Sequence, residues 1–188
     1  MKERGMIFNG EMVRAILDGG KTQTRRPVKV PHIDKDAMCE LSGNELAGEL
    51  LAGNYRNSPH GKPGDRIWVR ETWARYNIDQ DSHDMAYRAT PPADWPEEGR
   101  WRPSIHMPRW ASRLMLEITG VRVERLQAIT LGDICKEIGC GLYDFRPATY
   151  GFQVWEELWK SIYGEENWQA NPWVWVIEFK VVPNVQDN

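Results

Sequence analysis

The sequence predicts a mixed α+β fold, and two kinds of periodicity support this prediction. An alternation of apolar and polar residues, typical of strands, runs through residues 67–72, 114–123 and 173–181. Helical spacing of apolar residues appears between these stretches and before them, in residues 11–17, 131–138 and 152–162. Strands of uneven length, interrupted by a few helices and with a bend in the longest strand, indicate a small curved sheet or a β-barrel.

The length and composition fit one compact domain spanning residues 1–188. The chain is 41% hydrophobic and 27% charged, which is close to the globular average and excludes the disordered class. Its net charge of −3 gives no overall attraction for nucleic acid, so any contact with RNA must be local.

The cysteines and the amino terminus predict a reduced, cytoplasmic protein. There are three cysteines with no repeated metal-ligand spacing, and no cationic and apolar leader opens the chain. No apolar run approaches the roughly 18 residues that span a bilayer, so we expect no membrane partner. Because the four histidines also lack ligand spacing, we expect neither a metal ion nor a cofactor.

Two segments are expected to be insertions into the fold. Residues 28–62 are mixed in character and contain a small helix, and they are typical of an excursion rather than of core. Residues 74–110 are dense in Pro, Trp and charge, which predicts an ordered insertion over one mouth of the fold.

The remaining elements have sequence signals of their own. A bulge or bend is expected at Gly120 in the long strand, and Thr130 can cap the helix that follows. The helix at 152–162 should bury one face, formed by Phe152, Trp155, Leu158, Trp159 and Ile162.

The stretch GGKTQTRRP at residues 19–27 is the strongest local candidate for a site. A threonine hydroxyl such as that of Thr24 becomes a useful nucleophile beside a base. Lys21 could be that base if an apolar pocket lowers its pKa, or its charge could stabilise an oxyanion. Taken alone, the stretch is more typical of a solvated basic turn.

Other residues near this stretch are candidates for substrate binding. Arg25 and Arg26 could hold a phosphate or could pair with acidic residues, and the sequence favours neither. Trp68 and Trp73 could stack on a base, although tryptophan in a strand is more often core. Glu71, between them, could be a buried acid or could pair with a neighbouring arginine.

Four segments in order resemble the ASCH domain family, relatives of the PUA RNA-binding fold. They are ILDGGKTQTRR, GDRIWVRE, LEITGVRVERLQAIT and VWVIEFKVV, which together contain 43 of the 188 residues. The resemblance implies a central β-barrel with surrounding helices. The chain is longer than the small bacterial members because of its excursions, as are ASCH proteins of phage and prophage genomes.

The resemblance also implies an activity. The small bacterial amidohydrolase of this family removes the acetyl group from N4-acetylcytidine with a lysine, a threonine three positions later and a glutamate in the helix after the long strand. Lys21 and Thr24 match the first two, and an ungapped alignment of the long strand places Glu137 at the third.

The expected function is therefore hydrolysis of the N4-acyl amide of an acylated cytidine-type nucleoside or modified RNA base. Thr24 would be the nucleophile, or Glu137 would activate a water directly. A non-catalytic module that binds RNA or a modified base is the alternative, and a ribonuclease is a third reading.

Overall fold

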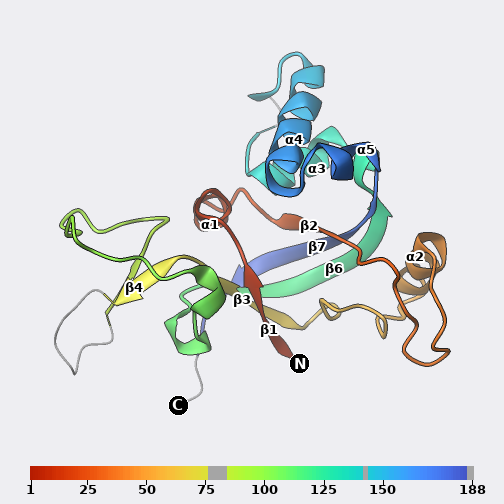
Figure 1. Cartoon of the computed structure of the whole chain (residues 1–188), viewed down its shortest axis with the longest axis horizontal. Helices are drawn as coiled ribbons and strands as arrows, with labels where there is room; N and C mark the ends of the chain where they lie inside the picture. Colours follow the sequence, from red (N-terminus) through yellow and green to blue (C-terminus); the bar gives the residue numbers. More distant parts are fainter. Residues whose placement is uncertain (76–83, 142–143, 186–188) are drawn as a thin grey trace.

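The computed structural model describes residues 1–75, 84–141 and 144–185. It confirms a mixed α+β fold in which five strands form one sheet in the order β1-β3-β6-β7-β2 (Figure 1). These strands are β1 (Glu3–Ile7), β2 (Gln23–Pro27), β3 (Arg66–Arg70), β6 (Met115–Arg125) and β7 (Trp173–Val182). Only β1 and β3 run parallel; the other neighbours are antiparallel.

The two edges of this sheet, β1 and β2, are not hydrogen-bonded to each other as strands in the described part of the chain. A side chain links them instead, because Nη2 of Arg26 donates to the carbonyl of Ile7 at 2.7 Å. The closed barrel that the sequence led us to expect is therefore not formed by the described strand pairs.

Five α-helices accompany the sheet in the described part of the chain. They are α1 (Gly10–Leu17), α2 (Gly43–Leu51), α3 (Leu131–Ile138), α4 (Ala148–Tyr163) and α5 (Glu165–Gln169). Figure 1 shows α3, α4 and α5 gathered on one side of the sheet, and α2 at the opposite end from β4. Three of the helices are capped by side chains that their sequences provide, namely Asn9, Ser42 and Thr130.

Strand β7 explains how the molecule holds two cores. Trp175 and Ile177 pack into the main core with α1 and α2, whereas Val174 and Val176 pack against α3 and α4 on the other face. A strand buried on both faces reads as a continuous apolar run, and residues 173–177 of β7 form such a run.

The long strand β6 contains the expected irregularity. Its register against β7 shifts between Ile118 and Gly120. Leu116 before the shift and Val121 after it both face the main core.

The first insertion is less peripheral than its composition indicated. Leu46 and Leu50 of α2 are buried in the main core, so residues 28–62 contribute to the interior rather than forming an excursion. The helical stripe at 42–53 was visible in the sequence, but which sheet face it covers depends on contacts between distant residues.

The second insertion carries more regular structure than expected. Its described part holds a two-stranded sheet, β4 (Trp73–Arg75) with β5 (Met85–Tyr87), followed by the 3-10 turns η1 (Ser104–His106) and η2 (Arg109–Ala111). A third such turn, η3 (Leu126–Ala128), follows β6. Residues 76–83 of the insertion, with His83, lie outside the described residues.

Helix α4 is partly different from its expected form. Trp155 and Trp159 are buried as predicted, but Phe152 and Ile162 are each 43% exposed. The prediction of a five-residue buried face was therefore wrong at both ends. At the first end, Gly151 takes the place of Phe152 against Leu131 and Phe145.

Candidate active site

The site begins with a close approach of two backbones. Gly19 ends the turn after α1 with φ of +78°, and the next residue, Gly20, lies against Gly139 at the end of α3. A Cβ atom on Gly20 would lie 2.6 Å from the carbonyl oxygen of Gly139. Only glycine fits here, and the amide of Thr22 then donates to the carbonyl of Lys136 at 3.0 Å.

This approach brings Lys21 against Glu137. The Lys21 ammonium donates to Oε2 of Glu137 at 3.2 Å, to the Glu137 carbonyl at 2.7 Å and to the Gln23 carbonyl at 2.7 Å. Both side chains are buried, at 1% and 4% exposure. Burial is the main cause that lowers the pKa of Lys21 from its usual 10.5, and the Glu137 carboxylate partly opposes this.

Arg25 holds the other oxygen of the same carboxylate. Its Nη1 donates to Oε1 of Glu137 at 2.9 Å and to Oε1 of Gln23 at 2.7 Å. Its Nη2 pairs with Glu124 and, at 3.4 Å, with Asp133. Since this guanidinium is fully buried and faces three carboxylates, it pairs with acids rather than being presented to a phosphate.

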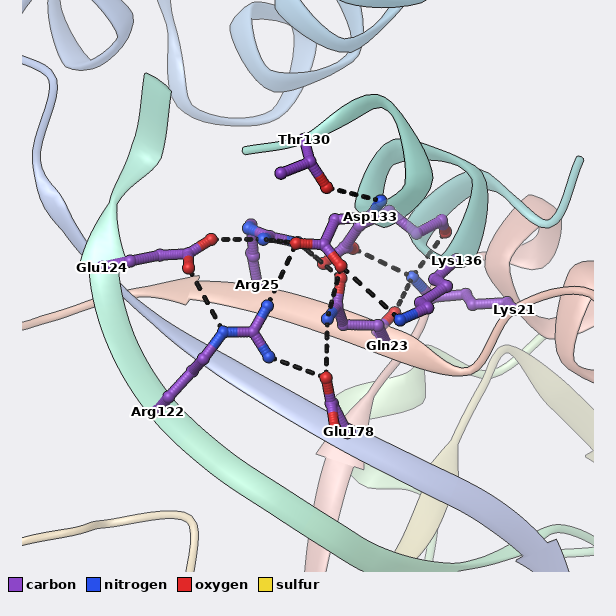
Figure 2. Close-up of polar contacts among 10 residues, drawn as sticks. Lys21, Gln23, Arg25, Arg122, Glu124, Thr130, Asp133, Lys136 and Glu178 are labelled. Atoms are coloured by element: carbon purple, nitrogen blue, oxygen red, sulfur yellow. Dashed lines mark hydrogen bonds and ion pairs between the residues drawn. The ribbon is translucent and has the colours of Figure 1, made fainter. Parts of the chain in front are cut away.

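A wider charged network surrounds Arg25 on one face of the sheet (Figure 2). Arg122 of β6 donates to Glu178 at 2.7 Å, to Asp133 at 3.1 Å and to Glu124 at 3.2 Å. Four carboxylates therefore face Lys21, Arg25 and Arg122, with Lys136 at the edge of the network 3.7 Å from Asp133. Of the cations clustered in the sequence, Lys21 and Arg25 are thus compensated by carboxylates of the protein itself.

Sequence reasoning missed Gln23, Arg122, Glu124, Asp133 and Glu178 as parts of this network. The stretch VRVER did contain a signal, because Arg122 and Glu124 alternate with two buried valines and so share the opposite face of their strand. Arg25 on β2, the partner of Glu124, is 99 residues away along the chain, whereas Asp133 on α3 is 11 residues from Arg122.

Thr24 lies on β2, paired with Ile177, and is 1% exposed. Its hydroxyl makes no hydrogen bond within residues 1–75, 84–141 and 144–185, and its side chain lines a cavity of about 270 Å³. Lys21, Arg25, Arg26 and Glu137 line the same cavity, so the structure brings the three expected catalytic residues together around one space.

The cavity lies at the free edge of β2, between α1 and α4. Its apolar wall comes from α4, through Trp155, Leu158, Trp159, Ile162 and Tyr163. The indole nitrogen of Trp155 is buried and has no hydrogen-bond partner among the described residues. The end that holds Lys21 and Glu137 is polar, and the opposite wall is aromatic.

Arg26 is half-buried beside this cavity. Its guanidinium lies 5.3 Å from the ring centre of Phe8, and its Nη2 is used by the Ile7 carbonyl. Of the two arginines proposed for substrate binding, it is the less enclosed by carboxylates.

The structure does not bring the other expected binding residues to the cavity. Trp68 packs over Gly5 of β1 with the Arg70 guanidinium 5.3 Å from its ring. Trp73 is buried in a small cluster with Met107 and Ala111. We therefore correct the expectation that either ring stacks on a base in this cavity; the aromatic surface available there belongs to α4.

Glu71 is buried too, but its partner is Arg113 rather than a neighbouring arginine. Arg113 donates to both oxygens of Glu71, at 2.8 and 2.9 Å. The distance of 42 residues between the two explains why local sequence reasoning named the wrong partners.

No group of three or more His, Cys, Asp or Glu side chains that could hold a metal ion occurs among the described residues. No helix in that same part of the chain is long and apolar enough to cross a membrane.

Comparisons with known proteins give a distant likeness of shape. No family model matches the chain, and no curated protein matches it. Protein EF3133 from Enterococcus faecalis V583, described under DUF984, is 10% identical with a TM-score of 0.46, covering 100% of this chain and 86% of its own. The hypothetical protein PH0355 is 16% identical with a TM-score of 0.41, covering 97% of this chain and 100% of its own. At these values neither neighbour carries a conclusion about family or activity.

Proposed function

We propose that this protein is an amidohydrolase that cleaves the N4-acyl amide of an acylated cytidine-type nucleoside, and that it is a long member of the ASCH family. One observation carries the proposal: Lys21, Thr24 and Glu137 line one cavity, with the ammonium of Lys21 3.2 Å from the Glu137 carboxylate. This arrangement supports the lysine–threonine–glutamate set that the resemblance implies.

In the proposed reaction, Oγ of Thr24 attacks the acyl carbonyl and Glu137 accepts the hydroxyl proton. Collapse of the tetrahedral intermediate breaks the carbon–nitrogen bond, and Glu137 returns the proton to the departing exocyclic amine. Water then hydrolyses the threonyl ester, again with Glu137 as base, and releases the carboxylic acid.

Lys21 has a positioning role in this proposal. Its three N–H donors have three acceptors, two carbonyls and one carboxylate oxygen, so the ammonium form satisfies every contact. It then has no free donor for an oxyanion, and we assign it to holding Glu137 at the cavity.

The aromatic wall of α4 suits a flat base. Trp155 and Trp159 offer ring surface, and the buried indole N–H of Trp155 could donate to a base acceptor after a small shift. The β-barrel of the ASCH family belongs to this proposal as well, with the Arg26 link between β1 and β2 at the position where such a barrel would close.

Hydrolysis of N4-acetylcytidine by the purified protein tests the proposal, with chromatography to detect cytidine and acetate. Thr24→Val removes the hydroxyl at nearly constant volume, and Glu137→Gln removes the base; each should reduce turnover by at least about a hundredfold. Thr24→Ser should retain turnover. A Thr24→Val variant that remains fully active would instead point to a water activated by Glu137.

A module that binds modified bases without catalysis is the second candidate. It is favoured by the Thr24 hydroxyl, which makes no hydrogen bond to Lys21 or Glu137 in the structure. Catalytic hydrogen bonds often tighten only when substrate is bound. Binding of N4-acetylcytidine without release of acetate would establish this second function.

A further inference from the structure

A second hollow, of about 610 Å³, adjoins the candidate active site. It lies on the other side of the amino-terminal end of α1, toward the second insertion, which supplies Arg88 and Ser104 to its wall. Ile7, Asn9 and Glu11 line both spaces, so the hollow and the cavity share a rim.

The sizes of the two spaces indicate a ligand with one part in the cavity and another part in the hollow. Pockets for small molecules usually measure about 300–1,000 Å³. The cavity of about 270 Å³ at Thr24 is below that range, whereas the adjoining hollow is more than twice as large. A base with its acyl group suits the cavity, and the rest of a larger substrate has the hollow to occupy.

The charged residues of the hollow indicate which part of the substrate it binds. Arg14 and Arg88 are both exposed there, and the Arg88 side chain makes no hydrogen bond or ion pair with the described residues. Arg14 uses Nη1 for the carbonyl of Ala89 at 3.1 Å, and its other guanidinium nitrogens have no acceptor among the described residues. Arginine in this state is suited to a phosphate, which it can bind with two parallel hydrogen bonds.

The acidic residues of the hollow do not cancel this charge. Both oxygens of Glu71 accept from Arg113, so that carboxylate is already neutralised. Glu11 is the remaining acid of the described lining, and it lies on the shared rim.

We propose that the hollow binds the sugar-phosphate part of the substrate, so that the natural substrate is a phosphorylated ribonucleoside and not the free nucleoside. This inference rests on the proposed function for the position of the base. Arg14 and Arg88 contact the phosphate. Glu11, between base and phosphate, accepts a hydrogen bond from a ribose hydroxyl, as acidic residues do at other nucleotide sites.

The same phosphate chemistry occurs in a mononucleotide and in an RNA strand. A short strand has further phosphates and a neighbouring base, whereas the mononucleotide has only the one group that the hollow contacts. A trinucleotide that binds more tightly than the mononucleotide identifies RNA as the source, and equal affinity identifies the mononucleotide.

Calorimetry with deacylated ligands, which have no acyl amide to hydrolyse, tests the inference independently of turnover. Cytidine, cytidine 5′-monophosphate and cytidine 3′-monophosphate are titrated into the protein at low salt. One of the monophosphates should bind at least about tenfold more tightly than cytidine, and the advantage should shrink as salt is raised. Affinities that are equal for all three ligands would overturn the inference.

Three arginine variants locate the contact. Arg88→Ala and Arg14→Ala should each reduce the advantage of the phosphate, whereas Arg100→Ala, at an exposed position that does not line the hollow, should preserve it. Thermal melting checks that all three variants are folded. A phosphate advantage that persists in the Arg88→Ala, Arg14→Ala double variant rejects the assignment.

The outcomes separate this inference from the amidohydrolase proposal. Hydrolysis of N4-acetylcytidine with no phosphate advantage would keep the enzyme and reject the phosphate site. A phosphate advantage that depends on Arg88, without hydrolysis of any acylated form, would keep the site and reject the enzyme.

Discussion

Lys21 and Glu137 are 116 residues apart in sequence, yet the Lys21 ammonium donates to both the side chain and the main chain of Glu137. The carbonyl contact fixes the end of α3, and the carboxylate contact fixes the orientation of the acid. Because Arg25 holds the second carboxylate oxygen, Glu137 is constrained at three points.

Arg25→Lys tests the importance of this constraint. Lysine keeps the charge but cannot bridge Glu137, Glu124 and Asp133 together, so the Glu137 carboxylate should lose its fixed position. We expect kcat on N4-acetylcytidine to fall by about 10- to 100-fold with KM changed much less. Arg122→Lys is the matched control, since Arg122 belongs to the network without contacting Glu137. Equal losses in both variants would refute a special role for Arg25.

The protonation of Lys21 predicts an alkaline limit to activity. Burial lowers its pKa from 10.5, so the ammonium that holds Glu137 loses its proton as pH rises through a value lower than 10.5. The rate should therefore fall as pH rises through this lowered pKa. A pH–rate profile of kcat measures the limit, and a rate that instead rises in this range would show that neutral Lys21 is the working base.

Gly20→Ala probes the approach that brings Lys21 to α3. The new methyl group would meet the Gly139 backbone at 2.6 Å, so one of the two segments must move. We expect a loss of about 1–3 kcal/mol in the free energy of unfolding together with reduced turnover. Gly48→Ala, in a helix with open space around it, should be neutral or stabilising. Denaturant titrations of both variants provide the comparison.

Leu158→Ala tests whether α4 selects the acyl group. Truncation of this wall residue enlarges the cavity beside Thr24, so a bulky acyl group should fit better. The ratio of kcat/KM for N4-benzoylcytidine to that for N4-acetylcytidine should rise about tenfold. Phe152→Ala, on the same helix but outside the cavity, is the control and should leave the ratio unchanged.

His60 predicts a dependence of stability on acid pH. Burial, with the nearby charges of Arg26 and Arg4, lowers the pKa of His60 from 6.5 to about 4. Between these two values the unfolded chain binds the proton and the folded chain does not, so stability falls as pH decreases from 6.5 to 4. The contribution is at most about 3 kcal/mol. Denaturant titrations should show it, and His60→Gln should remove it while His106→Gln, at an exposed position, should not.

Local sequence signals predicted the parts of the fold that depend on neighbouring residues. The Thr130 cap, the Gly120 irregularity and the helix after Ser42 were all readable, because capping, bulges and amphipathic periods act over a few residues. The positions of Lys21 and Thr24 followed from a compact motif. Glu137 followed only from the resemblance, since nothing in its spacing separates it from an exposed helix residue.

The other features of the site depend on contacts between residues that are distant in the sequence. Glu71 pairs with Arg113, and Trp73 is enclosed by residues near 107–111, so neither is available at the cavity. The aromatic wall comes from α4, whose period was visible but whose target surface was not. The apolar face of an amphipathic helix can pack against a core or can line a cavity, and its sequence period is the same in both cases. Only the tertiary arrangement distinguishes the two.

The register shift at Gly120 determines which residues of β6 face the main core and which face the charged network. Leu116 and Ile118 face the main core from even positions, and Val121 and Val123 face it from odd ones. If all of these residues continued from Ile118 as a regular strand without the shift, alternation would exchange the two faces beyond that point. Arg122 and Glu124 would then point into hydrocarbon and the valines toward Arg25. One unpaired residue, Thr119, on a strand separated from that of Thr24 only by β7, therefore decides on which side of the sheet the charge lies.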